Sequence, residues 1–436
     1  MSLETPEKIR MLQKKLYSKA KQEPDYRFYL LYDKIYRDDI LRHGWALAKD
    51  NGGAPGVDGK SFEEIEAAGL EEWLNGIREQ LRSRTYKPEP VRRVMIPKAG
   101  GGERPLGIPT IRDRVVQSAA KLVIEPIFEA DLEAEAYGYR PKRSAKDAIQ
   151  KVHQHICEGY TDVVDADLSK YFDTIPHGDL IQSIARRIVD RDVLHLIKMW
   201  LKTPIEERDE NGKSRWTGGS GSTCGTPQGG VISPLLANVY MNRFLKYWRM
   251  TDRGAAFRAR IITYADDFVI LSRGHAAEAM EWTRRVMTQL GLQLNEAKTS
   301  LRDARQERFD FLGYTFGPHW YVPMKRRYLG ASPSKRSIAR LKLKVRALLE
   351  PHNVSPWPEV RDKLNRMLRG WSEYFNYGTR SGAYQSVNRY VSDRVRHFLR
   401  RRHKVSSRGT VRFPAEVVFK DLGVLRMSQR VRGDPA

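Results

Sequence analysis

The sequence has only two cysteines, Cys157 and Cys224, among its 436 residues. Because no CxxC pair is present, we expect neither a disulfide framework nor a zinc finger, and a reducing compartment fits this composition. No apolar run approaches the roughly 18 residues that are needed to span a bilayer. The charged start "MSLETPEKIR" also lacks the apolar segment of a signal peptide. These absences predict a soluble protein of the cytoplasm.

Acidic residues are also scarce relative to basic ones. The chain has 77 Lys and Arg against 53 Asp and Glu, which gives a formal net charge of +24. The excess is concentrated in residues 324–436, which contain 27 Lys and Arg but 8 Asp and Glu. Such a local excess attracts polyanions, of which nucleic acid is the commonest, although a merely solvated surface is the alternative.

What is present is a globular composition, with 40% hydrophobic and 10% aromatic residues. Hairpins are predicted at 91–109 and at 205–226, and three amphipathic helices with basic outer faces are predicted after Ser334. Residues 1–50 look helical. Their aromatic cluster at 26–36 either stacks on RNA bases or belongs to the core.

Two aspartates interrupt the most strand-like stretch, "IITYADDFVIL" at 261–271. The apolar residues suit a buried sheet, whereas Asp266 and Asp267 are costly to bury unpaired. We predict a β-hairpin with residues 265–267 at its tip, so that both carboxylates leave the ladder and face one site. Neighbouring carboxylates repel each other unless a cation separates them, and oxygen ligands select Mg²⁺. An ordinary Asp-containing turn is the alternative.

A third acid lies upstream, in "VVDADLSKYFDTIPH". Asp165 and Asp167 share one face of a predicted strand because side chains repeat every second residue. Three carboxylates can hold two Mg²⁺ ions, with Mn²⁺ as the alternative ion. Such a pair can activate a 3′-hydroxyl and stabilise a leaving pyrophosphate in line with it.

Taken together, "YADD", "DADLSKYFDTIPH" and "GTPQGGVISPLLANVYMN" resemble the palm of reverse transcriptases. More narrowly, the chain resembles the group II intron reverse transcriptase/maturase family. The blocks "GAPGVDG", "VRRVMIPKAGGGERPLGIPTIRDRVVQ", "AYGYRPKRSAKDAI", "GLQLNEAKTSL" and "FDFLGYTF" occur in the family's order, and "LRGWSEYFNYG" with "VSDRVRHFLRRRH" resembles its maturase domain.

The resemblance implies an α+β right-hand polymerase fold with an α-helical thumb. Residues 1–50 would be a helical, RNA-contacting extension, residues 51–323 the fingers and palm, and residues 324–436 a basic three-helix thumb/maturase (X) domain. No cluster of His and paired Cys follows "RRHKV". The chain therefore resembles members without the DNA-endonuclease domain, and we do not expect it to cleave a second DNA strand by itself.

The resemblance also implies roles for individual residues. The metal-binding catalytic acids would be Asp167, Asp266 and Asp267, with the Leu168 carbonyl as a further ligand and Asp165 as a structural neighbour. The implied nucleotide-binding residues are Lys98 and Arg104 on the triphosphate, Phe172 against the sugar 2′ position, Gln228 against nucleotide or template, and Lys298. The expected RNA-binding residues are Arg394, Arg396, Arg400, Arg401 and Arg402.

The implied function is that of an RNA-directed DNA polymerase that binds its intron RNA, assists splicing and makes cDNA during intron mobility. Its partners would be the intron RNA, an RNA template with a DNA primer, dNTPs and a DNA target, with no membrane. On DNA it would act at the nucleoid. The alternatives are a domesticated relative that serves DNA repair or defence, and an RNA-binding splicing cofactor with weak polymerase activity.

Overall fold

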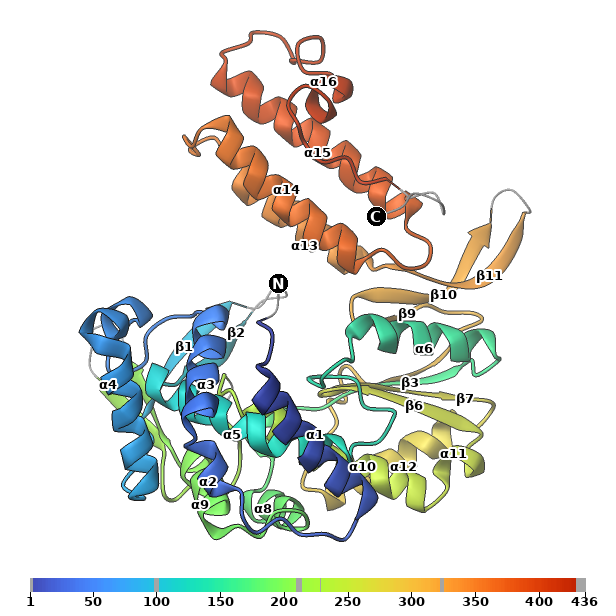
Figure 1. The fold of residues 1–436 in the computed structure, drawn as a ribbon. Coiled ribbons are helices and arrows are strands. Elements are labelled where there is room, and N and C mark those ends of the chain that lie inside the picture. The colour runs from blue at the N-terminus through green and yellow to red at the C-terminus, as the bar shows by residue number, and fades with distance from the viewer. Residues whose placement is uncertain (1–2, 98–101, 209–213, 228, 322–324, 429–436) are drawn as a thin grey trace.

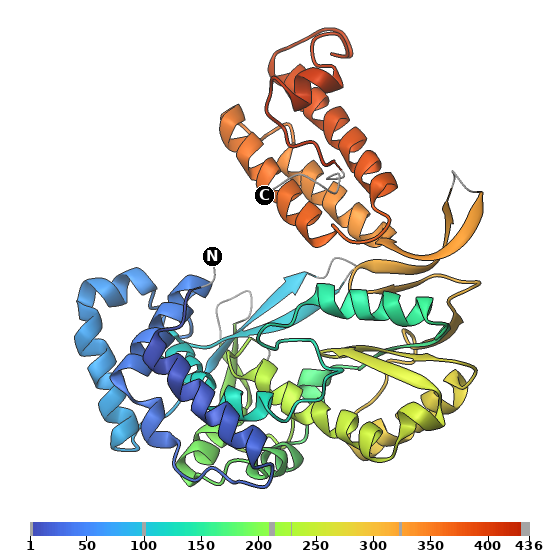
Figure 2. The ribbon, with the colours of Figure 1, turned by 45° about the vertical axis from the view of Figure 1, so that its right-hand side comes forward.

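The computed structural model describes residues 3–97, 102–208, 214–227, 229–321 and 325–428. Helices and three sheets alternate along these residues, which confirms the α+β class expected from the sequence. A helical bundle formed by the C-terminal residues stands above the rest of the chain, to which it is joined by β10 and β11 (Figures 1 and 2). No described helix has the length and apolar character that a membrane crossing requires.

The N-terminal helices pack around α5, which is buried along most of its length, its polar residues Asp113, Arg114 and Gln117 included. Among the aromatic residues at 26–36, Phe28 is buried, and Tyr26, Tyr32 and Tyr36 pack against the core, whereas Tyr29 is exposed. The core interpretation thus holds for most of this cluster. The helices of this layer are α1 (Glu7–Gln22), α2 (Tyr32–Ile35), α3 (Asp38–Asn51), α4 (Phe62–Arg82) and α5 (Ile111–Glu129).

The first sheet has the strand order β2-β1-β4-β5. It consists of β1 (Val91–Pro97), β2 (Glu103–Ile108), β4 (Pro204–Arg208) and β5 (Ser214–Gly218). Both predicted hairpins are present, but the second is shorter than the predicted span of 205–226. Its last strand ends at Gly218 because the following chain turns toward another partner, and the Thr226 amide donates to the Phe172 carbonyl at 2.6 Å.

The central sheet, β6-β7-β3-β8, is covered on both faces. Val163 and Leu271 pack toward α6, whereas Val164 and Ile270 pack with α10 and α12 on the opposite face. Figure 1 shows α6 above this sheet and α10 and α12 below it. The elements are β3 (Asp162–Asp167), β6 (Ala259–Tyr264), β7 (Asp267–Ser272), β8 (Ser300–Asp303), α6 (Ala145–Cys157), α10 (Ser233–Met250) and α12 (Ala276–Gln289). The short helices nearby are α7 (Tyr171–Thr174), α8 (His177–Ala185), α9 (Arg191–Leu201) and α11 (Arg253–Ala256).

A third sheet, β11-β10-β9, leads into the C-terminal bundle. The three amphipathic helices predicted after Ser334 are α13, α14 and α15, and they enclose a hydrophobic core of their own that includes Leu341, Leu364 and Val391. The elements are β9 (Phe309–Phe311), β10 (Tyr314–Tyr321), β11 (Arg326–Pro333), α13 (Lys335–Leu348), α14 (Trp357–Tyr374), α15 (Ser381–Arg402) and α16 (Ala415–Phe419).

Candidate active site

Three carboxylates meet at one end of the central sheet. Strands β3 and β7 are antiparallel neighbours, and their register places Asp167 directly opposite Asp267. Directly opposed residues have Cα atoms about 4.5–5.5 Å apart and side chains on the same face. Asp266 precedes Asp267 in the turn that joins β6 to β7. Residues far apart in the sequence thus form one acidic site.

The β6–β7 turn is tighter than the sequence predicted. Tyr264 pairs with Asp267, so only Ala265 and Asp266 form the tip. Asp267 therefore stays in the ladder between β6 and β3, and the prediction that both aspartates leave it is wrong for Asp267. Ala265 has a φ of 58°, a left-handed conformation that a side chain disfavours. The turn needs such a residue because two-residue hairpin connections require positive φ.

Burial sets the protonation of these acids. It raises the pKa of Asp267 to about 7, with the neighbouring carboxylates of Asp266 and Asp167 adding to the effect. Burial also raises the pKa of Asp266. Asp165, which faces Ser300 of β8 and Val269 of β7, has its pKa raised by burial to about 6. The nearby positive groups therefore do not fully compensate the negative charge that these carboxylates would carry when ionised.

Two side chains that follow α12 bind Asp167. The Lys298 ammonium lies 2.6 Å from Asp167 Oδ2, and Asn295 Nδ2 donates to the same oxygen at 3.3 Å. The hydrogen bond with Asp167 raises the pKa of Lys298. The Lys298 side chain is 65% exposed whereas that of Asp167 is 17% exposed. The ammonium can therefore leave the carboxylate for another anion without unpacking the core.

The chain after β3 continues along the site. The Leu168 amide donates to the Asp266 carbonyl at 3.4 Å, and Leu168 also forms an isolated bridge with Leu294. Phe172 on α7 is 6% exposed, and its carbonyl accepts the Thr226 amide. The Tyr171 hydroxyl donates to the buried Ala237 carbonyl at 2.6 Å. Tyr171 therefore points into the core, and Phe172 is the aromatic residue left beside the "GTPQGG" segment.

Among the described residues of the first sheet, Arg104 on β2 has a charge that affects the pKa of a site aspartate. Its charge lowers the pKa of Asp266, against the dominant effect of burial. Tyr139 lies in the same field: burial and then the charge of Asp266 raise its pKa, and Arg104 lowers it. The other predicted nucleotide-binding residues, Lys98 and Gln228, lie outside the described residues.

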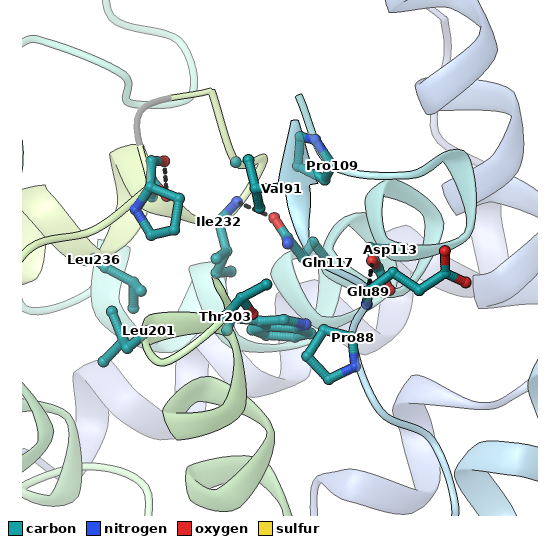
Figure 3. Close-up of a pocket in the computed structure, with 14 residues that line it drawn as sticks. Pro88, Glu89, Val91, Pro109, Asp113, Gln117, Leu201, Thr203, Ile232 and Leu236 are labelled. Atoms are coloured by element: carbon teal, nitrogen blue, oxygen red, sulfur yellow. Dashed lines mark hydrogen bonds between the residues drawn. The ribbon is translucent and has the colours of Figure 1, made fainter. Parts of the chain in front are cut away.

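The segment that carries Gln228 is anchored from both sides. The Ile232 amide donates to Gln117 Oε1 of α5 at 3.3 Å, and the Ser233 hydroxyl donates to the Pro227 carbonyl at 2.9 Å. Figure 3 shows Gln117 directed at Ile232 in a small pocket between β1, α5 and the start of α10. The pocket is lined mainly by apolar side chains and does not include the three acids. We therefore regard it as part of the packing that supports this loop and not as part of the acidic site.

The three aspartates have the oxygen donors that Mg²⁺ prefers. A dication would also remove the repulsion that contributes to the raised pKa of Asp267. Across the described ranges, no group of three or more His, Cys, Asp or Glu side chains is arranged so that it could hold a metal ion as it stands. The fit to Mg²⁺ rests on the chemistry of these oxygen donors, and waters and substrate phosphates would have to supply the other ligands.

The five predicted RNA-binding arginines of α15 differ in their surroundings. Arg402 donates to the carbonyls of Ser355 and Val354 at 2.7 and 3.0 Å. Arg394 contacts the Leu349 carbonyl at 3.5 Å, and Arg396 pairs with Asp393. In the part of the chain that the structure describes, Arg401 is exposed and makes no ion pair or side-chain hydrogen bond. Arg400 packs its alkyl chain near Gly409.

The sequence pattern missed Asn295, Tyr139, Asn238 and Gly138. The Asn238 side chain donates to the Gly138 carbonyl at 2.8 Å, and Gly138 lies against the tip of the β6–β7 turn. Neither Asn contact has a local signal, because the two partners lie 100 and 128 residues apart in the sequence. All four residues do lie in blocks that resemble the family: Gly138 and Tyr139 in "AYGYRPKRSAKDAI", Asn238 in "GTPQGGVISPLLANVYMN" and Asn295 in "GLQLNEAKTSL".

Comparisons with known proteins agree with this geometry. Residues 96–316 match the family model of reverse transcriptases (RNA-dependent DNA polymerases), and residues 338–412 match the maturase-specific domain of group II introns. Protein YkfC of Escherichia coli is 35% identical over 343 residues, which cover 70% of this chain and 87% of YkfC. The group II intron-encoded protein LtrA of Lactococcus lactis is 35% identical over 233 residues, 53% of this chain and 37% of LtrA.

Nuclear intron maturase 2 of Arabidopsis thaliana is 32% identical over 107 residues, which cover 24% of this chain and 14% of that protein. The chain thus spans most of YkfC but well under half of LtrA and of the plant maturase. The reverse transcriptase match includes all three site aspartates, and the maturase match covers most of the basic bundle. The chain belongs to the reverse transcriptase family as an RNA-directed DNA polymerase that carries a group II intron maturase-specific domain.

Proposed function

We propose that this polymerase binds a group II intron RNA, assists its splicing and copies RNA into cDNA during intron mobility. The observation that supports the proposal best is the β3–β7 register, which sets Asp167 opposite Asp267 with Asp266 beside them. A primer 3′-hydroxyl would attack the α-phosphate of a dNTP, so that one phosphodiester bond forms and pyrophosphate leaves. Two Mg²⁺ ions bound by the aspartates and the Leu168 carbonyl would activate that hydroxyl and stabilise the leaving group.

The chain's own cations would bind the triphosphate. Arg104 already acts on Asp266, and a guanidinium can grip phosphate oxygens with two hydrogen bonds. Lys98 and Gln228 have the roles that the family resemblance implies. Lys298 partly neutralises Asp167 in the absence of substrate, and its exposed ammonium would transfer to a phosphate when the nucleotide arrives.

Phe172 would select deoxyribonucleotides. Phe172 lies at the start of α7, shortly after Asp167 at the end of β3, and its backbone carbonyl accepts a hydrogen bond from the Thr226 amide. An aromatic ring that is almost fully packed cannot move aside for a 2′-hydroxyl without a large steric cost. Because the Tyr171 hydroxyl is directed at Ala237, it does not compete for this role.

RNA binding would rest mainly on the C-terminal residues. In this proposal residues 324–436 form the thumb/maturase domain, residues 51–323 the fingers and palm, and residues 1–50 an RNA-contacting extension. The bundle's excess of basic residues suits an RNA backbone, and Arg401 presents a charge that no described partner occupies. The name of LtrA describes a group II intron-encoded protein, which supports an intron RNA as the partner. A DNA target, and action in the cytoplasm and at the nucleoid, complete the proposal.

Asp266→Asn tests the proposed site. The variant should lose primer extension on an RNA template but keep its RNA affinity, because the chemistry needs the carboxylate and affinity rests on distributed basic contacts. Asp165→Asn is the matched control, since Asp165 lies on the same sheet and should leave extension close to wild type. Extension by pure Asp266→Asn above about 1% of the wild-type rate would refute the assignment.

Sequencing of the RNA that copurifies with the wild-type protein tests the proposed partner. A group II intron RNA should be enriched over total cellular RNA. Intron RNA at background level, together with full polymerase activity, would instead favour a domesticated role in repair or defence. If an intron RNA copurifies, the Asp266→Asn variant can be tested with it. A variant that still assists splicing of that RNA but never extends a primer would separate the maturase function from the polymerase.

A further inference from the structure

The tip of the β6–β7 turn does not hold its conformation by itself. Ala265 is left-handed, with a φ of 58°, a conformation that is unfavourable for a residue with a side chain. Strained backbone of this kind persists where the surrounding structure determines it. Asp266 follows Ala265 directly, so whatever supports the tip also sets the position of that carboxylate.

The support comes from residues 135–139, which run beside β6. The Tyr137 amide donates to the Thr263 carbonyl at 2.9 Å, and the Thr263 amide donates to the Glu135 carbonyl at 2.9 Å. Gly138 then packs directly on the tip. A Cβ atom at Gly138 would lie 2.5 Å from the Ala265 amide nitrogen and 3.0 Å from the Tyr264 carbonyl carbon. The first distance is shorter than Cβ contacts in proteins and the second is at the tight limit, so only glycine fits this approach without a shift of the backbone.

Helix α10 fixes the segment from behind. Asn238 donates to the Gly138 carbonyl at 2.8 Å. One helical turn later, Asn242 donates to the Asp131 carbonyl at 3.0 Å and accepts the Glu133 amide at 3.0 Å. Arg140 closes the same loop by donating to the Glu133 and Ala136 carbonyls. The catalytic turn is thus pressed against a backbone that is itself bound to a core helix.

We infer that Gly138 and Asn238 are positioning residues: they fix the position of the Ala265–Asp266 turn relative to the central sheet, and hence the position of the Asp266 carboxylate. The inference rests on the proposed role of Asp266. A methyl group at Gly138 must displace the turn, because its closest neighbours are backbone atoms that cannot rotate away. Displacements of about 1 Å in reacting groups can cost about a hundredfold in rate.

The test uses the full chain and primer extension on one RNA template. Gly138→Ala should lower kcat by about 10- to 100-fold, with the KM for dNTP changed by less than about threefold and RNA affinity unchanged. Amide hydrogen exchange at residues 264–267 should become faster. Gly178→Ala is the matched control, because a Cβ there would meet no atom within 4 Å. A kcat for Gly138→Ala equal to that of Gly178→Ala would overturn the inference.

A second pair of variants decides the question if Gly138→Ala does not fold. Asn238→Ala removes the donor to Gly138, whereas Asn242→Ala removes the same side chain from the same helix and segment but leaves Gly138 bound. Asn238→Ala should lower kcat more than Asn242→Ala does, and equal values would overturn the inference. Asp266→Asn in the same assay separates the two proposals. If Asp266→Asn remains active, the catalytic assignment fails. If it is inactive while each test variant has the same kcat as its control, only the positioning role fails.

Discussion

Replacing Asp267 with Asn should stabilise the metal-free protein at pH 8 but much less at pH 5. Burial, Asp266 and Asp167 raise the pKa of Asp267 from 3.8 to about 7, so the folded state keeps a proton that the unfolded state has released. The folded state therefore loses stability as the pH rises from about 4 to about 7. At about 1.4 kcal/mol per pKa unit, the full cost is about 4 kcal/mol. Asp267 also exposes part of its surface at the start of β7, so solvent screens its charge, and the neighbouring acids share what remains; we therefore expect Asn to recover about 1 kcal/mol at pH 8.

Thermal unfolding in EDTA at pH 5, 6, 7 and 8 measures this effect. The midpoint of Asp267→Asn should exceed that of wild type by about 1–2 °C at pH 8, and the difference should shrink toward pH 5. Asp25→Asn, at an exposed position, controls for the loss of one negative charge. Added Mg²⁺ should stabilise wild type more than the variant. A difference in midpoint that does not depend on pH would refute the view that Asp267 is ionised at a cost.

Two further predictions concern selectivity and RNA binding. Phe172→Val should raise the kcat/KM ratio of ribonucleotide to deoxyribonucleotide by about tenfold or more, whereas Tyr171→Phe should leave that ratio unchanged; an unaltered ratio in a folded, active Phe172→Val enzyme would make Phe172 a core residue only. Arg401→Ala should weaken RNA binding and reduce its salt dependence by about one counterion, because the guanidinium is exposed. Arg402→Ala should instead lower the unfolding midpoint, because the variant loses hydrogen bonds to two carbonyls. If the salt dependence of RNA binding has the same slope for Arg401→Ala as for wild type, Arg401 does not contact RNA.

Local pattern was sufficient for the elements. The apolar runs of strand-forming residues around the three aspartates predicted strands. The stripes after Ser334 predicted the three long helices of the bundle, because side-chain periodicity follows directly from helix geometry. The mixed α+β class followed from these elements and from the order of the family blocks. What failed locally was the exact extent of turns: Asp267 remains in the ladder, and the second hairpin ends at Gly218 rather than 226.

The sequence by itself determined which residue types were available for chemistry: the paired carboxylates alone also suited an ordinary turn, and it was their combination with the other blocks that resembled a reverse transcriptase palm. Only the tertiary structure decided their environment. The β3–β7 register set Asp167 opposite Asp267, and the chain 131 residues further on brought Lys298 to Asp167. The contact of Gly138 with the Ala265 turn is of the same kind. Such contacts depend on how sheets and helices stack, and no periodicity within either segment encodes the distance between them.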